Sequence, residues 1–257
     1  MLLAIDTGNT QTVIGLFDGA ELRSQWRIAT NAERTADEHA LLVAHLLELH
    51  GVDVDDVTDG VAIASTVPAL TSTLRDMAER WFELPTLVLE PGVRSGVAIL
   101  ADNPHEVGAD RVANTVAAFD RFGGACIVVD FGTSTNFDVV SERGEYLGGA
   151  IAPGIEIGMD ALFSRAAALR RVDLVTPRRA VGRTTVECIQ SGLLYGHAEM
   201  VDGLCRRFQA EVGPCPVVAT GGLSGLIAPL SRAIGHHEPW LTLHGLRLVF
   251  ERNRPRR

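Results

Sequence analysis

"VVDFGTSTNFDVVSERGEYLGG", residues Val128–Gly149, repeats a pattern that already stands near the N-terminus as "AIDTGNTQTVIGLFDG", residues Ala4–Gly19. In each copy an apolar strand runs into an Asp-x-Gly turn rich in hydroxyl or amide side chains, and a second strand and a second turn follow. Superposing Asp6 on Asp130 also superposes the glycines two residues later. The match extends over several consecutive elements, which favours an internal duplication over a chance recurrence of Asp-x-Gly turns.

The predicted elements follow the same order in both halves of the chain. In the first half we expect strands at 2–5, 13–17, 22–28, 61–65 and 86–89. We expect helices at 36–49, 68–81 and 108–122. In the second half we expect strands at 126–129, 137–140, near 146 and at 217–219, and helices from 184 to about 208 and from 224 onward. Thr35 with Glu38, and Thr184 with Glu187, form capping-box patterns at two helix starts. The fold class is therefore α/β, with two homologous domains, 1–117 and 118–257, facing each other across a cleft.

Bulk composition excludes several classes of partner. The 257 residues carry a formal net charge of -9, which disfavours the broad electropositive surface that binding to nucleic acid or to an anionic membrane requires. No apolar run approaches the roughly 20 residues needed to span a bilayer, and no leader pattern precedes the first motif. We therefore expect a cytoplasmic protein with neither nucleic acid nor membrane as partner.

All 23 basic residues are arginine, because the sequence contains no lysine. This absence excludes mechanisms that depend on a lysine, namely the P-loop, the protein-kinase fold and Schiff-base catalysis. Any phosphate group must be held by backbone amides, hydroxyls, arginine or a bound cation.

The two Asp-x-Gly turns offer such a phosphate site. Glycine lets a phosphate approach the backbone, and the neighbouring hydroxyls and amides can donate hydrogen bonds to it. The carboxylates of Asp6 and Asp130 can hold a hard cation that offsets the repulsion between carboxylate and phosphate. Taken alone, each turn is better explained as an ordinary hairpin, and only the pair of turns favours a phosphate site; the glycine-rich stretch 219–224 is either a nucleotide contact or a plain strand-to-helix turn.

A segment between the two copies has no counterpart in either of them. In "NPHEVGADR", residues 103–111, Asp110 and Arg111 stand where a helix begins. An aspartate in the first turn of a helix is favoured by the helix dipole alone. The functional alternative makes Asp110 a general base that accepts a hydroxyl proton, with Arg111 steering an oxygen of the substrate.

These motifs together resemble one family. "DTGNT", "NPHEVGADR", "DFGT" and "TGG", joined by "LGGAIAPGI", "GRTTVECIQSG" and "LTLHGLRLVFERN", resemble the type III pantothenate kinases over essentially the whole chain. That family belongs to the superfamily of acetate and sugar kinases, heat-shock chaperones and actin, whose members have duplicated ribonuclease-H-like domains of the actin-like ATPase type. The resemblance implies ATP-dependent phosphorylation of pantothenate to phosphopantothenate, the first step of coenzyme A biosynthesis, by an alcohol-group phosphotransferase.

The resemblance also implies roles for individual residues. ATP is expected to contact the first turn and one residue of the second: Asp6, Thr7, Gly8, Asn9, Thr10, Gln11, Thr12, Val13 and Thr133. The expected pantothenate site consists of Gly108, Ala109, Asp110, Arg111 and Thr185. Asp110 is then the proton acceptor, and Thr185 reaches the substrate from the neighbouring subunit of a homodimer. Asp130 is expected to bind a monovalent cation, potassium or ammonium, and magnesium accompanies ATP.

The sequence departs from the family pattern at two positions. Ala101 stands where many members have a tyrosine that contacts the substrate, and Asn136 stands where threonine is common. Two alternatives to a kinase remain: a nucleotide-binding regulatory or accessory protein that keeps the ATP cleft without kinase activity, and a filament former of the actin type. The retained pair Asp110–Arg111 favours the kinase, and the shortness of the chain disfavours the filament former.

Overall fold

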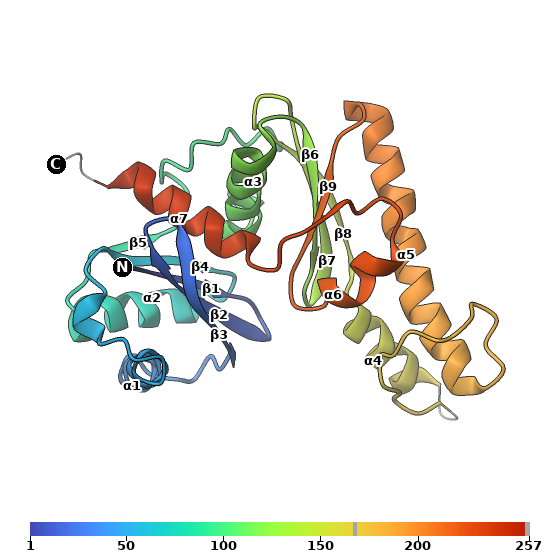
Figure 1. Ribbon diagram of the computed structural model, residues 1–257, viewed down its shortest axis with the longest axis horizontal. Coiled ribbons are helices and arrows are strands. Elements are labelled where there is room, and N and C mark those ends of the chain that lie inside the picture. The colour runs from blue at the N-terminus through green and yellow to red at the C-terminus, as the bar shows by residue number, and fades with distance from the viewer. Residues whose placement is uncertain (167–168, 255–257) are drawn as a thin grey trace. The chain divides into compact units, whose positions relative to one another are not determined.

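The computed structural model describes residues 1–166 and 169–254, which form two compact units (Figure 1). The first unit comprises Met1–Ala117 together with the C-terminal segment that begins at Leu241, and the second comprises Ala118–Trp240.

The first unit contains a five-stranded mixed sheet with the order β3-β2-β1-β4-β5. β1 pairs antiparallel with β2 and parallel with β4. The strands and helices are β1 (Leu2–Thr7), β2 (Gln11–Asp18), β3 (Glu21–Ala29), α1 (Ala36–Glu48), β4 (Gly60–Ser65), α2 (Pro68–Asp76), β5 (Thr86–Val88), α3 (Ala109–Phe122) and α7 (Leu241–Asn253). Short helical turns cover Val54–Asp56, Met77–Trp81 and Pro104–Glu106.

The second unit repeats this architecture. Its sheet has the order β10-β9-β6-β7-β8, with β6 antiparallel to β7 and parallel to β9. The elements are β6 (Cys126–Phe131), β7 (Ser134–Val140), β8 (Tyr146–Pro153), α4 (Ile155–Arg165), α5 (Thr185–Val212), β9 (Val217–Thr220), α6 (Ser224–Ile227) and β10 (His236–His237), with a helical turn at Ala228–Leu230. Because β6, β7, β8, β9 and β10 occupy the places of β1 to β5, the two units have the same topology, as an internal duplication requires.

Buried side chains on both faces of the first sheet explain its helix positions. Leu3, Ile5 and Ile63 pack with Val43 and Leu70, which come from α1 and α2. On the opposite face, the ring of His244 in α7 lies edge-on to that of Phe17, with centroids 5.3 Å apart. Burial of apolar area on both faces is the main stabilising term for such a sheet.

The position of α7 differs from the predicted domain division. The sequence placed residues 241–257 in the second domain, whereas α7 packs against the first sheet, and Thr242 Oγ1 donates to the buried Asn114 Oδ1 at 2.8 Å. The side chains Leu243, Leu246 and Val249 are almost fully buried. The helix joins the first unit because its apolar face is buried there, which a pattern local to the sequence cannot reveal.

The predicted capping box forms completely at the start of α1 and only in part at the start of α5. At α1, Thr35 Oγ1 accepts from Glu38 N at 3.3 Å and Glu38 Oε2 accepts from Thr35 N at 2.8 Å, so both halves of the box form. At α5, Thr184 accepts from Glu187 N, but the Glu187 carboxylate accepts from Arg183 N instead of Thr184 N. Among the residues that the structure describes, none of the helices combines the length and the apolar character that crossing a membrane demands.

Candidate active site

The first Asp-x-Gly turn joins β1 to β2 and is fastened by one threonine. Gly8 N donates to Gln11 O at 3.0 Å and closes the turn. Thr30, the residue directly after β3, donates from Oγ1 to Gly8 O at 2.8 Å and from its backbone N to Thr10 O at 3.0 Å. Its hydroxyl also lies 2.9 Å from that of Thr12. Thr30 therefore holds the turn at three points.

Side chains of this turn divide into a buried and an exposed set. Thr7 and Thr12 are 0% and 1% exposed, so their hydroxyls face the interior of the unit. Asn9, Thr10 and Gln11 are exposed. Of the residues predicted to contact ATP here, these three have exposed side chains, and Asp6, Gly8 and Val13 are partly exposed.

The second turn joins β6 to β7 and is one residue shorter. Gly132 N donates to Ser134 O at 3.0 Å, and Gly154 N donates to Thr133 O at 3.1 Å. Thr133 itself is exposed. The residue after this turn, Thr135, is buried and pairs with Phe131 across the hairpin, as Thr12 pairs with Thr7 in the first unit.

Asp130 lies against the glycine-rich stretch 219–224. Gly221, directly after β9, has φ +90°, and a Cβ at this position would come within 2.3 Å of Asp130 Oδ1 and 2.7 Å of Phe131 N. Only glycine meets both demands, because it tolerates positive φ and leaves room for the carboxylate. The structure thus brings together Asp130 and the Thr-Gly-Gly motif, which are about 90 residues apart in sequence.

This arrangement fits a hard monovalent cation. The Asp130 carboxylate packs directly against the backbone at Gly221, which has no side chain, and carboxylate and carbonyl oxygens are the ligands that such ions prefer. Across the described parts of the chain, no three or more His, Cys, Asp or Glu side chains cluster as they would around a metal ion. Asp130 would thus hold the cation with backbone or substrate oxygens rather than with a set of acidic residues.

The unrepeated segment Gly108–Arg111 stands at the start of α3. Asp110 Oδ1 accepts from Arg111 N at 2.9 Å, and a Cβ at Gly108 would lie 2.4 Å from the same oxygen. The carboxylate is folded back over Gly108, and a side chain at that position would displace it. Burial raises the pKa of Asp110, more than the hydrogen bond from Arg111 N and the Arg111 charge lower it. A carboxylate with a raised pKa is a stronger proton acceptor, which suits a general base.

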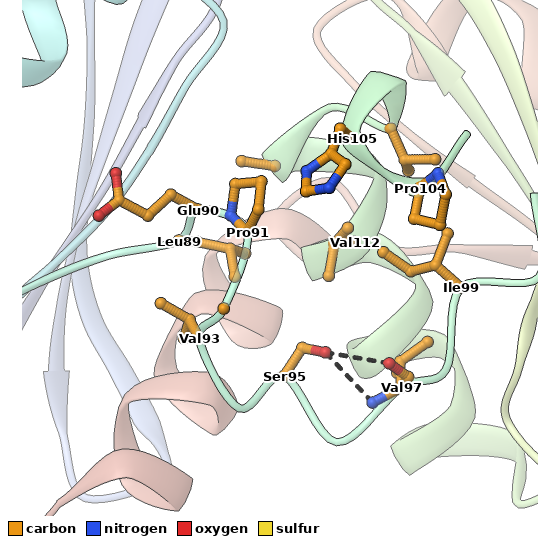
Figure 2. Close-up of a pocket in the computed structure, with 13 residues that line it drawn as sticks. Leu89, Glu90, Pro91, Val93, Ser95, Val97, Ile99, Pro104, His105 and Val112 are labelled. Atoms are coloured by element: carbon orange, nitrogen blue, oxygen red, sulfur yellow. Dashed lines mark hydrogen bonds between the residues drawn. The ribbon is translucent and has the colours of Figure 1, made fainter.

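A pocket of about 320 Å³ adjoins this segment in the first unit (Figure 2). Val107 and Ala109, on either side of Gly108, contribute to its wall. The remaining lining is mostly apolar and comes from residues 89–99, Pro104, His105 and Val112. Figure 2 shows His105 at the rim between Pro91 and Pro104, and Ser95 bonded to the backbone of Val97.

Thr185 is the first residue of α5 in the second unit and is exposed. Its neighbour Thr184 caps the helix, so the hydroxyl of Thr185 is not required for that task. Exposure at a helix start leaves this hydroxyl available to a ligand or to a second subunit.

The fold defines a class of protein with duplicated ribonuclease-H-like domains. The structure of an inorganic polyphosphate/ATP-glucomannokinase from Arthrobacter sp. strain KM matches with a TM-score of 0.53 at 15% identity, over 98% of this chain and 99% of that one. Component A of the (R)-2-hydroxyglutaryl-CoA dehydratase of Acidaminococcus fermentans matches with a TM-score of 0.56 at 15% identity, over 97% and 96%. Such likeness confirms the predicted actin-like fold class.

Sequence similarity then defines the family. A family model for type III pantothenate kinase matches residues 2–207. The type III pantothenate kinase of Frankia alni is 56% identical over 98% of this chain and 100% of its own length. The chain therefore belongs to the type III pantothenate kinase family. The predicted activity, ATP-dependent phosphorylation of pantothenate in coenzyme A biosynthesis, is confirmed at the level of the family.

Two supporting residues were missed by sequence reasoning. Thr30 fastens the first turn from β3, and His197 lies behind the second turn, with Nε2 2.8 Å from Thr135 Oγ1. A lone threonine at a strand end and a lone histidine on a long helix carry no local signal. Each becomes visible only when the fold brings it to its turn.

Proposed function

We propose that Asp110 is the general base of the pantothenate kinase reaction and that Arg111 orients the substrate. As the hydroxyl oxygen of pantothenate bonds to the γ-phosphorus of ATP, its O–H bond breaks and the proton passes to Asp110. The bond from the γ-phosphorus to the oxygen of the β-phosphate breaks, and ADP leaves. The observation that carries this proposal is the partly buried carboxylate with a raised pKa, held over Gly108 at the start of α3, where the neighbouring residues Val107 and Ala109 line a pocket.

The proposal assigns ATP to both turns. In the first unit, Asp6 to Val13 would contact the nucleotide through the Gly8 backbone and the exposed side chains of Asn9, Thr10 and Gln11. In the second unit, Thr133 would do so. Because the chain has no lysine, the phosphate charge would be offset by magnesium carried with ATP and by a monovalent cation, potassium or ammonium, at Asp130.

A single assay tests the reaction and the cation together. The protein is incubated with ATP, magnesium and pantothenate in potassium, ammonium or sodium chloride at equal ionic strength, and phosphopantothenate is measured. We expect product with potassium or ammonium and much less with sodium. Absence of product under all three conditions would contradict the proposed function, whereas equal rates would contradict only the cation site.

We also propose that the chain acts as a cytoplasmic homodimer. Seven large apolar side chains of the second unit are exposed, and they come from β8, α4, the start of α5 and the segment between these helices: Leu147, Ile151, Ile157, Leu162, Val175, Val181 and Val186. An apolar surface of this kind is typical of a subunit interface. Thr185 stands next to Val186 and would reach the substrate of the partner subunit.

Light scattering during size-exclusion chromatography tests the dimer. Ile151, 67% exposed on β8, is replaced by aspartate, and Leu41, 74% exposed on α1 of the first unit, is replaced likewise as a control. We expect the first variant to be monomeric with reduced activity and the second to remain dimeric. A monomeric wild type would overturn the proposal.

A further inference from the structure

We propose that His197 is a positioning residue for ATP, acting through Thr135 on the second turn. The inference rests on the proposed function, in which Thr133 of that turn contacts ATP. His197 lies on α5, more than sixty residues from the turn, and lies outside the motifs by which the family was recognised.

The contact between His197 and Thr135 is short and enclosed. Thr135 closes the hairpin by pairing with Phe131, is 1% exposed, and places Oγ1 2.8 Å from His197 Nε2. The imidazole also lies beside the ring of Phe131, with centroids 6.4 Å apart. His197 therefore touches the residues on both sides of Gly132–Ser134. Moving the imidazole would shift both ends of the turn that presents Thr133.

The imidazole is neutral near pH 7, because burial lowers the pKa of His197 below its usual value. A neutral ring has one donor nitrogen and one acceptor nitrogen, so it can accept from or donate to the threonine hydroxyl. A fixed hydrogen bond to a buried hydroxyl holds the side chain in one rotamer. The histidine thus holds the Thr135 side chain through a hydrogen bond and does not act through a charge.

In the first unit, a different residue holds the equivalent threonine of the hairpin. Thr12 occupies the register position of Thr135, and its hydroxyl is anchored by Thr30 instead of a histidine. In both units the threonine after the turn is tied to a residue outside the hairpin. This recurrence supports a role in shaping the turn rather than an incidental contact.

His197, unlike Thr30, lies on a long helix that also carries a residue of the expected substrate site. α5 is a helix of 28 residues that begins at Thr185 and also carries His197. A continuous helix transmits displacement along its length, so the helix that would present Thr185 to the substrate also supports the ATP turn. We expect damage at His197 to weaken ATP binding first.

The test is steady-state kinetics on His197→Leu, His197→Gln and Thr135→Val, with thermal melts to verify folding. Loss of one buried hydrogen bond predicts that His197→Leu and Thr135→Val each raise KM for ATP about fivefold, with kcat and KM for pantothenate changed less than twofold. Glutamine can restore a polar group near the position of Nε2, so His197→Gln should lie within about twofold of wild type. Combining His197→Leu with Thr135→Val should raise KM no further than either alone.

Tyr195→Phe is the matched control. Tyr195 lies on the same helix, and its hydroxyl donates to Pro177 O at 2.9 Å, away from the turn. This variant should leave KM for ATP unchanged. If wild type is active and folded Thr135→Val or His197→Leu keeps its KM for ATP, or if Tyr195→Phe raises it equally, the inference is wrong. An inactive wild type would instead contradict the proposed function.

Discussion

The two Asp-x-Gly turns have the same place in the same topology, yet each is held differently. In the first, Thr30 on the neighbouring strand bonds the turn backbone directly and contacts the hydroxyl of Thr12. In the second, a histidine on a long helix contacts the equivalent threonine, and the Asp130 carboxylate lies against Gly221. Duplication preserved the strands and the buried threonine, while the anchors and the surroundings of the carboxylate diverged.

This divergence separates the roles of the two turns from that of the unrepeated segment. In the proposed site both turns offer backbone and hydroxyl groups for phosphate, and in the second turn the aspartate packs directly against a glycine, Gly221. Asp110 belongs to neither copy and has a raised pKa. We therefore propose that the repeated parts bind ATP and that the segment between them takes part in proton transfer.

The largest expected effect follows from replacing Asp110 by asparagine. We expect kcat to fall by about 10² to 10⁴, the usual contribution of a general base, while KM for ATP changes little. Because the pKa of Asp110 is raised, its ionisation disfavours folding near pH 7, so removing the charge should not lower the free energy of unfolding. Stopped assays and urea unfolding measure the two quantities.

Asp120, exposed on the same helix, provides the matched control for that variant. Asp120→Asn should retain full activity. Full turnover by Asp110→Asn would mean that the unrepeated segment does not supply the general base.

Gly221→Ala is expected to have the next largest effect. Its Cβ would meet Asp130 Oδ1, and φ is +90°, so we expect loss of activation by potassium as well as roughly 1–3 kcal/mol of stability. Gly213 has the same φ of +90° with no atom within 4 Å, so Gly213→Ala isolates the backbone cost. Equal potassium activation in the two variants would show that the space beside Asp130 is not the cation site.

A smaller change is expected at the anchor of the first turn. Thr30→Val removes the bonds to Gly8 O and to the Thr12 hydroxyl, and we expect KM for ATP to rise roughly five- to tenfold. Thr30→Ser keeps the hydroxyl and should behave like wild type. A variant that lost kcat but kept KM would mean that the first turn takes part in the reaction and not only in binding.

The smallest effect concerns the dependence of activity on pH. A base must be ionised, and the raised pKa of Asp110 keeps its proton to a higher pH than an ordinary aspartate, near 3.9, would. As the pH is lowered, we therefore expect kcat/KM for pantothenate to start falling at a pH above the ordinary pKa of aspartate. An acidic limb at or below the ordinary value would mean that another group accepts the proton.

Much of this architecture was predictable, because local patterns decide local structure. Alternating apolar residues and the Asp-x-Gly turns predicted both hairpins, and the box of Thr35 and Glu38 predicted the start of α1. The helix predicted over 68–81 ends as an α-helix at Asp76 and continues as a π-helical turn to Trp81. The helix expected from 224 covers only Ser224–Ile227 before a tighter turn takes over at Ala228.

What the sequence could not predict are contacts between distant segments. α7 joins the first unit through burial of its apolar face and through Thr242, which meets Asn114 across more than a hundred residues. The contacts of Thr30 with Gly8 and of His197 with Thr135 likewise join residues 22 and 62 positions apart in sequence. Such pairs depend on how sheets and helices pack against one another, and the local sequence pattern does not predict them.

The non-equivalence of the two turns is tested most directly by a potassium titration of activity in Asp6→Asn and Asp130→Asn, each compared with wild type. We predict that Asp130→Asn loses the difference between potassium and sodium, because its carboxylate is the one that packs against the backbone at Gly221. Asp6→Asn should keep that difference even if its KM for ATP rises. The reverse pattern, with dependence on potassium lost at Asp6 and kept at Asp130, would contradict the account.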